Sequence, residues 1–129
     1  MSNPALTRAL NLSQYRSEKV SGFEFYVAET SEQHANGLSG LSSLDKDGML
    51  FVFANPTGTP FHMADMQVDL DIAFYNHDGG LIKQGTYSKH YRGPIFSPSP
   101  YSYVVEAVAA KIDFSALDIT EMVRAQCQN

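Results

Sequence analysis

The chain has 129 residues, which is the length of one domain and excludes an enzyme with separate cofactor and substrate lobes. Its 9 lysines and arginines against 14 aspartates and glutamates give a net charge of −5, which disfavours bulk attraction to nucleic acid or to an anionic membrane. The single cysteine, Cys127, excludes an internal disulfide and a multi-cysteine zinc site, and it favours a reducing compartment.

Residues 1–21 are predicted to form an N-terminal arm, followed by one domain at 22–129. The arm is polar and lacks the apolar run of a signal peptide, and no later apolar stretch is long enough to span a membrane. We therefore expect a soluble protein of the cytoplasm or of a virion, without a membrane partner.

The first half of the predicted domain combines strands with one short helix. Aromatic and β-branched residues predict a strand at 23–27. Thr30 and Gln33 then form a capping-box pattern, which predicts a helix that ends near Gly37. The continuous apolar run at 49–53 is typical of a strand buried on both faces.

The next segments predict two strands and a hairpin. Residues 61–63 and 70–75 have the apolar composition of strands. The Asp-Gly pair at 78–79 favours a tight reversal, because it supplies the positive φ angles that such a turn needs. The return strand is expected at 81–86.

The last third of the chain begins with a long loop. Residues 87–101 contain three prolines and show no strand or helix period, and loops of this length tend to be functional or mobile. A strand is predicted at 103–108, and the capping pattern at 118–121 predicts a second short helix. The expected fold is mainly β: a compact, mostly antiparallel sheet or barrel-like domain with one or two short helices.

Several of these segments, in this order and spacing, resemble domain-of-unknown-function family 192, a family of small bacterial and phage-borne domains. The matching segments are residues 27–30, 37–38, 48–53, 70–74, 78–79 and 103–106. The resemblance runs from Phe23 to about Val108 and implies a compact, mostly antiparallel β domain. It implies no activity, because the family has no established reaction.

The chain departs from the family pattern between the predicted strands. Where the family has Phe-Trp-Met-Lys-Asn-Thr, residues 61–66 read Phe-His-Met-Ala-Asp-Met, so the Trp, Lys and Asn are replaced. The family's Ile-Pro-Leu-Asp is Val-Asp-Leu-Asp at 68–71, and Leu41 stands where an arginine is frequent. If the family's polar cluster is a shared site, this chain has lost most of it.

One polar group of this segment is a candidate site. His62, Asp65, Asp69 and Asp71 fall within ten residues, and an imidazole with carboxylates suits a divalent metal or a general base with an orienting acid. The spacing matches no metal signature, so a structural role is favoured. Asp71 is the best candidate for a partly buried carboxylate, with a hydrogen bond to a loop N–H as its favoured role.

The long loop has the composition of a contact surface. Tyrosine and arginine side chains bury area at a low entropic cost. A loop folded over its own core explains the composition equally well. The contact candidates are Tyr87, His90, Tyr91, Arg92, Phe96 and Tyr101.

The sequence contains no glycine-rich phosphate loop, no serine nucleophile elbow and no nucleic-acid motif. We therefore expect a non-enzymatic binding or assembly module, without a cofactor or a metal and without a nucleic-acid partner. It would contact a protein partner or a second copy through the arm and the 87–101 loop, for example as a structural or decoration protein of a phage-like assembly. The alternative is a small-ligand or metal-dependent enzyme domain that uses His62, Asp65 and Asp71.

Overall fold

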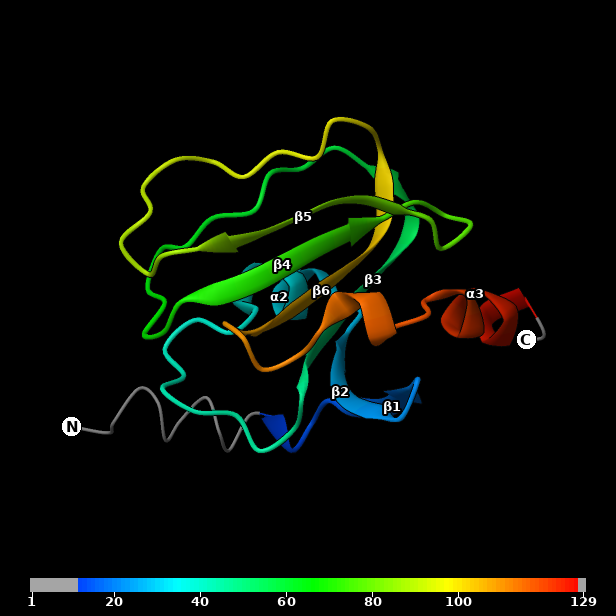
Figure 1. Cartoon of the computed structure of the whole chain (residues 1–129), viewed down its shortest axis with the longest axis horizontal. Coiled ribbons are helices and arrows are strands. Elements are labelled where there is room, and N and C mark those ends of the chain that lie inside the picture. The colour runs from blue at the N-terminus through cyan, green and yellow to red at the C-terminus, as the bar shows by residue number, and fades with distance from the viewer. Residues whose placement is uncertain (1–11, 128–129) are drawn as a thin grey trace.

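Residues 12–127, which the structure describes, fold around one six-stranded β-sheet with two short α-helices, as the computed structural model shows (Figure 1). The strands are β1 Arg16–Val20, β2 Phe23–Ala28, β3 Gly48–Thr57, β4 Leu70–Tyr75, β5 Leu81–Tyr87 and β6 Tyr101–Val108. The helices are α2 Ser31–Asn36 and α3 Thr120–Cys127, with a 3₁₀ turn η1 at Phe114–Ala116.

The strand order is β1-β2-β3-β6-β4-β5, so β6 lies at the centre and β1 and β5 form the edges. All neighbours are antiparallel except β2 and β3, which are parallel. A parallel pair needs a crossover connection, and α2 lies in that connection. The prediction of a mainly β, mostly antiparallel domain with short helices is confirmed.

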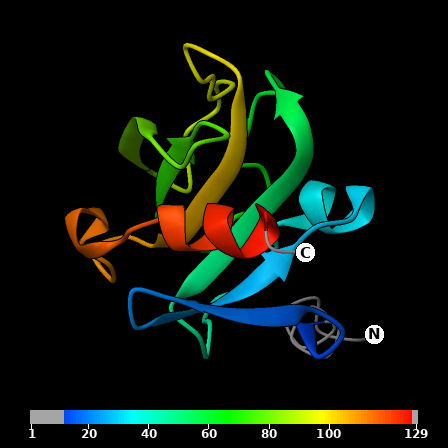
Figure 2. The ribbon, with the colours of Figure 1, turned by 90° about the vertical axis from the view of Figure 1, so that its right-hand side faces the viewer.

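The sheet buries side chains on both faces, because successive residues of a strand point to opposite sides. Phe51 and Phe74 belong to the cluster on one face, below α2 and the 58–66 segment. Leu50 and Val105 pack on the other face, with Met122 of α3. Figure 2 shows α3 crossing in front of β3 and β6.

A capping box starts α2, as the sequence predicts. The Thr30 hydroxyl accepts from the Gln33 N–H at 3.1 Å, and the Gln33 side chain accepts from the Thr30 N–H at 3.2 Å. The helix ends at Gly37, whose φ of +49° lies in the region that favours glycine. These local bonds fix the position of His34 above β3.

The strand predicted at 61–63 is wrong. Only Phe61 pairs there, in one bridge with Ile95, by reciprocal N–H to carbonyl bonds of 2.9 and 2.8 Å. Pro60 precedes the bridge and has no N–H to donate, and the left-handed φ of +63° at Asp65 turns the chain away soon after it. The bridge instead ties the 58–66 segment to the 87–101 loop.

The predicted N-terminal arm divides into two parts in the structure. Residues 1–11 lie outside the described residues. Strand β1, at positions 16–20, pairs antiparallel with β2, and Val20 is buried. The Ser21 hydroxyl then accepts from the Asp118 N–H at 2.8 Å. The second part of the predicted arm is therefore an edge strand that is attached to the segment before α3.

Substitution of Gly48 tests the close approach of β3 to β6. In Gly48→Ala, the new Cβ would lie 2.4 Å from the Glu106 carbonyl oxygen, so one of the two strands must shift. We expect the free energy of unfolding, measured by urea denaturation, to fall by about 2 kcal/mol or more. Gly58→Ala is the matched control, because nothing lies within 4 Å of its Cβ, and we expect a change within about 0.5 kcal/mol. Equal effects of the two substitutions would contradict this packing.

Candidate functional site

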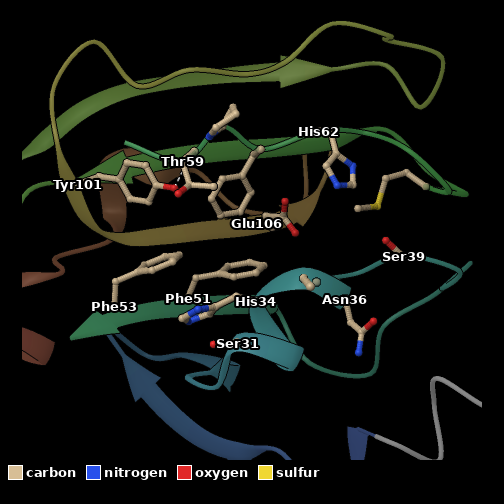
Figure 3. A pocket seen from close by; sticks show the side chains of 15 residues that line it. Ser31, His34, Asn36, Ser39, Phe51, Phe53, Thr59, His62, Tyr101 and Glu106 are labelled. Atoms are coloured by element: carbon tan, nitrogen blue, oxygen red, sulfur yellow. Dashed lines mark hydrogen bonds between the residues drawn. The ribbon is translucent and has the colours of Figure 1, made fainter. Parts of the chain in front are cut away.

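A cavity of about 410 Å³ lies between α2, β3, β6 and the 58–66 segment (Figure 3). Its apolar wall consists mainly of aromatic rings, and its polar lining comes from both histidines of the region, from small polar side chains and from one carboxyl group. Ala35 and His62 lie at the exposed rim. The aromatic residues of the wall are Phe51, Phe53, Phe61 and Tyr101.

Glu106 supplies the carboxyl group of the cavity lining. It occupies the central strand β6, opposite Met49 of β3 and Ile72 of β4, and only 1% of it is exposed. Its Oε1 atom is buried and has no hydrogen-bond partner. Figure 3 shows the carboxyl group between the segment that carries His62 and the residues at the end of α2.

Burial controls the charge of Glu106. Desolvation raises the pKa of this carboxyl group to about 8, because no nearby positive charge or hydrogen bond offsets the loss of water. The group is therefore predominantly neutral at pH 7. A buried polar atom without a partner costs about 1–3 kcal/mol, and such atoms are rare in native folds. A bound molecule with a hydrogen-bonding group at this atom would remove this cost.

His34 holds α2 on the sheet. Its Nε2 lies 3.0 Å from the Ala28 carbonyl oxygen and 2.9 Å from that of Val52, so Nε2 carries the proton and donates to the backbone. The ring also stacks on Phe53, with the centroids 4.1 Å apart. His34 thus forms a fixed part of the cavity wall, and its Nε2 proton is already bonded.

The other ring donors of the wall are positioned by nearby backbone groups. The Tyr101 hydroxyl donates to the Thr59 carbonyl oxygen, and burial raises the pKa of Tyr101 to about 12. His62 Nδ1 accepts from the Ala64 N–H at 3.2 Å, so the neutral imidazole carries its proton on Nε2. Among the ring donors of the wall, that proton alone makes no hydrogen bond to residues 12–127.

The three residues of the predicted polar site lie in different places and do not form one site. His62 lines the cavity, whereas Asp71 lines a second cavity of about 290 Å³. Asp71 accepts from the Ala110 N–H at 2.9 Å and from the Thr86 hydroxyl, which is the loop hydrogen bond favoured from the sequence. Asp65 is exposed and lines neither cavity. Within residues 12–127, no group of three or more His, Cys, Asp or Glu side chains could hold a metal ion.

The predicted contact residues of the loop differ in exposure. Tyr91 is 44% exposed and Phe96 is 54% exposed, and His90 and Arg92 are also at the surface. Tyr87 is partly buried and packs edge to face on Tyr91, with the centroids 5.4 Å apart.

Tyr101 is a correction to that list, because it is fully buried and belongs to the wall of the cavity. Its ring packs against Phe53 and Phe74, with the centroids 5.3 and 5.0 Å away. The prolines before it indicate a loop, but they do not show that the chain has rejoined the sheet at this residue.

Sequence reasoning did not single out Glu106, although a signal was present. Glu106 follows Val104 at a spacing of two in an apolar strand, so it shares the face of a core residue. An acidic side chain at such a position needs a partner or a function. Asp71 also lies within an apolar strand, and there the structure supplies two hydrogen-bond donors.

The model of domain-of-unknown-function family 192 (DUF192), described as "Uncharacterized ACR", matches residues 13–124. The chain belongs to this family. No curated protein is significantly similar to it.

Two solved structures resemble this DUF192 domain. One is a protein of unknown function from Novosphingobium aromaticivorans, with 26% identity and a TM-score of 0.63 over 73% of this chain and 71% of that one. The other is a putative transcription regulator from Sinorhizobium meliloti, with 23% identity and a TM-score of 0.66 over 74% and 76%. The second likeness concerns the fold alone. No helix within residues 12–127 combines the length and the apolarity needed to cross a bilayer.

The buried carboxyl group predicts a pH-dependent stability. The pKa of Glu106 is raised to about 8 from 4.5, so the folded protein keeps a proton that the unfolded chain has lost. The contribution of this proton to the free energy of unfolding is fully present below about pH 4.5 and is lost as the pH rises through about 8.

We therefore expect the free energy of unfolding of wild type, relative to Glu106→Gln, to fall by about 1.2 kcal/mol per pH unit on average between pH 5 and pH 8. Urea denaturation across this range measures the difference. A constant difference between the two proteins would show that Glu106 is ionised in the fold.

Proposed function

We propose that this protein is a binding domain for a small organic ligand, which enters the cavity below α2 and bonds to the Glu106 carboxyl group. The observation that carries the proposal is the Oε1 atom of Glu106, which is buried, faces the cavity and has no partner. The sequence offered, as its alternative, a small-ligand domain that uses His62, Asp65 and Asp71. In the proposed site His62 stays at the rim, and Glu106 replaces the two aspartates as the carboxyl group.

The size and the rigidity of the cavity support the proposal. Ligand pockets are commonly about 300–1,000 Å³, mostly apolar, and lined by a few well-placed polar groups. The cavity of about 410 Å³ has this composition. Two of its walls are the neighbouring strands β3 and β6, and α2, which forms another wall, is held on the sheet by the hydrogen bonds of His34. The site therefore needs little ordering when a ligand enters.

Two methionines report on ligand binding in one experiment. Met66 lines the cavity, whereas Met122 packs on the opposite face of the sheet. We expect a screen of small amines, alcohols and carboxylic acids, followed by methyl NMR of ¹³C-methionine, to find ligands that shift the Met66 signal and leave the Met122 signal in place.

A rim substitution provides the matched control. Ala35 is exposed at the rim, so Ala35→Trp fills the entrance and leaves Glu106 unchanged. Ligands found with wild type are expected to lose at least about tenfold in affinity, which corresponds to about 1.4 kcal/mol. Equal shifts of both methionines, or an undiminished affinity in Ala35→Trp, would place the binding elsewhere and sink the proposal.

A second candidate function is contact with a protein through the 87–101 loop. The exposed side chains of Tyr91 and Phe96 support it, since aromatic side chains are enriched at interfaces. The Lys83 ammonium donates to the Phe96 carbonyl oxygen at 2.8 Å, so the loop is attached to the edge strand β5. A role of the arm and of a phage-like assembly stays a prediction, since residues 1–11 lie outside the described part of the chain.

Self-association is the form of this contact that can be measured directly. We expect sedimentation velocity to show concentration-dependent association of wild type, and Phe96→Ser to weaken it at least about fivefold, because the substitution removes an exposed ring. Ala54→Ser, at another exposed position, serves as the control. A monomer at every concentration would contradict self-association through the loop.

A further inference from the structure

We infer that the ligand of the cavity is a small organic cation, whose ammonium group pairs with the Glu106 carboxyl group while its apolar body packs against the aromatic wall. This inference rests on the proposed function and adds the chemical class of the ligand. It depends on three observations: the charges that face the cavity, the arrangement of the rings, and the charge of the segments that form the walls.

The charged groups that face the cavity favour a cation. Among the residues that the structure describes, no lysine or arginine lines it, so an anionic ligand would meet no fixed positive charge. Glu106 is its single carboxyl group, and the Oε1 atom of that group has no donor. The ring donors of His34 and Tyr101 are already bonded to backbone carbonyls. A ligand that brings its own N–H donors therefore suits the site.

The rings of the wall are packed at steep angles to one another. Phe61 lies edge to face with Phe51 and Tyr101, at centroid distances of 5.1 and 6.0 Å. Tyr101 lies edge to face with Phe53 at 5.3 Å. Aromatic faces attract cations by about 0.5–2 kcal/mol each, and groups of rings bind alkylated ammonium ions in other proteins. An aromatic wall around one carboxyl group combines both of the interactions that such a cation uses.

The segments that form the walls carry acidic side chains and no basic ones. Within α2, β3, β6 and residues 58–66, the charged side chains are Glu32, Asp65 and Glu106, and none of these segments contains a lysine or an arginine. Clustered charge of one sign raises the local concentration of oppositely charged ligands. This field favours the approach of a cation over that of a neutral or anionic molecule.

Cation binding would be coupled to the release of a proton. Burial raises the pKa of Glu106 to about 8, and the carboxyl group must ionise to pair with an ammonium group. The other titratable groups that face the cavity are His34 of α2, His62 of the 58–66 segment and Tyr101 of β6. If Glu106 alone titrates, the affinity for a permanent cation rises about 50-fold between pH 6 and pH 8.

Three aromatic ligands of similar size and different charge test the inference: benzylammonium, benzyl alcohol and benzoate. We expect isothermal titration calorimetry of the full chain at pH 8 to give at least about tenfold tighter binding for benzylammonium than for benzyl alcohol, and the weakest binding for benzoate. The binding enthalpies measured at pH 7 in phosphate and in Tris are expected to differ by about the difference between the ionisation enthalpies of the two buffers. The reason is that about one proton passes from the protein to the buffer when the ligand binds.

Three variants assign the preference to one carboxyl group. Glu106→Gln keeps the shape of the side chain and removes the charge, and we expect it to bind the amine and the alcohol equally and to lose the pH dependence. Glu32→Gln makes the same chemical change at an exposed position of α2, and we expect it to keep both the preference for the amine and the pH dependence. His62→Gln is expected to keep the preference for the amine. This result would show that the preference depends on Glu106 and not on the histidine.

The outcomes separate this inference from the proposed function. If benzyl alcohol or benzoate shifts the Met66 signal and binds as tightly as benzylammonium, the cavity binds ligands but the cation class is wrong. If benzylammonium binds best and keeps its preference in Glu106→Gln, the charged contact lies outside the cavity and the inference is overturned. If none of the three ligands shifts Met66 while other ligands of the screen do, the inference fails and the proposed function stands. If no ligand of the screen shifts Met66, both fail.

Discussion

The central position of β6 is the constraint on which the rest of the structure depends. β6 pairs with β3 on one side and with β4 on the other, and its residues 101–107 are buried. A side chain on this strand must pack, bond or lose its charge. Val104 and Val105 pack on opposite faces, and Glu106 is held predominantly neutral at pH 7 in the cavity wall.

The two faces of the same strand explain why the candidate site lies where it does. On the face of Val105, α3 and the segment before it fill the space with apolar side chains. On the face of Val104, the cover consists of the six-residue helix α2 and an irregular segment, and these leave a space next to Glu106. The hydrogen bonds of His34 and Tyr101 attach this cover to the sheet at fixed points. A rigid floor with a partly open cover is the usual arrangement of a binding pocket.

Elements with a local signal could be predicted from the sequence, whereas features that depend on strand order could not. The capping box of Thr30 and the Asp-Gly turn are coded within a few residues, and α2 and the β4–β5 hairpin formed as expected. The segment at 61–63 has strand composition, but its neighbour is a loop that offers one bridge at Ile95. The burial of Tyr101 and of Glu106 follows from the insertion of β6 between β3 and β4, and no local pattern encodes that insertion.

The sheet order also determines when this chain can fold. β6 is the last of the six strands in the sequence, yet β3 and β4 have no contact in the sheet except through it. During synthesis the ribosome therefore releases two separate halves of a sheet, each with an unpaired inner edge, until residues 101–108 emerge. Most of the sheet's pairings join distant parts of the chain, which slows folding. A nascent chain of this design depends on protection of those two edges until its central strand arrives.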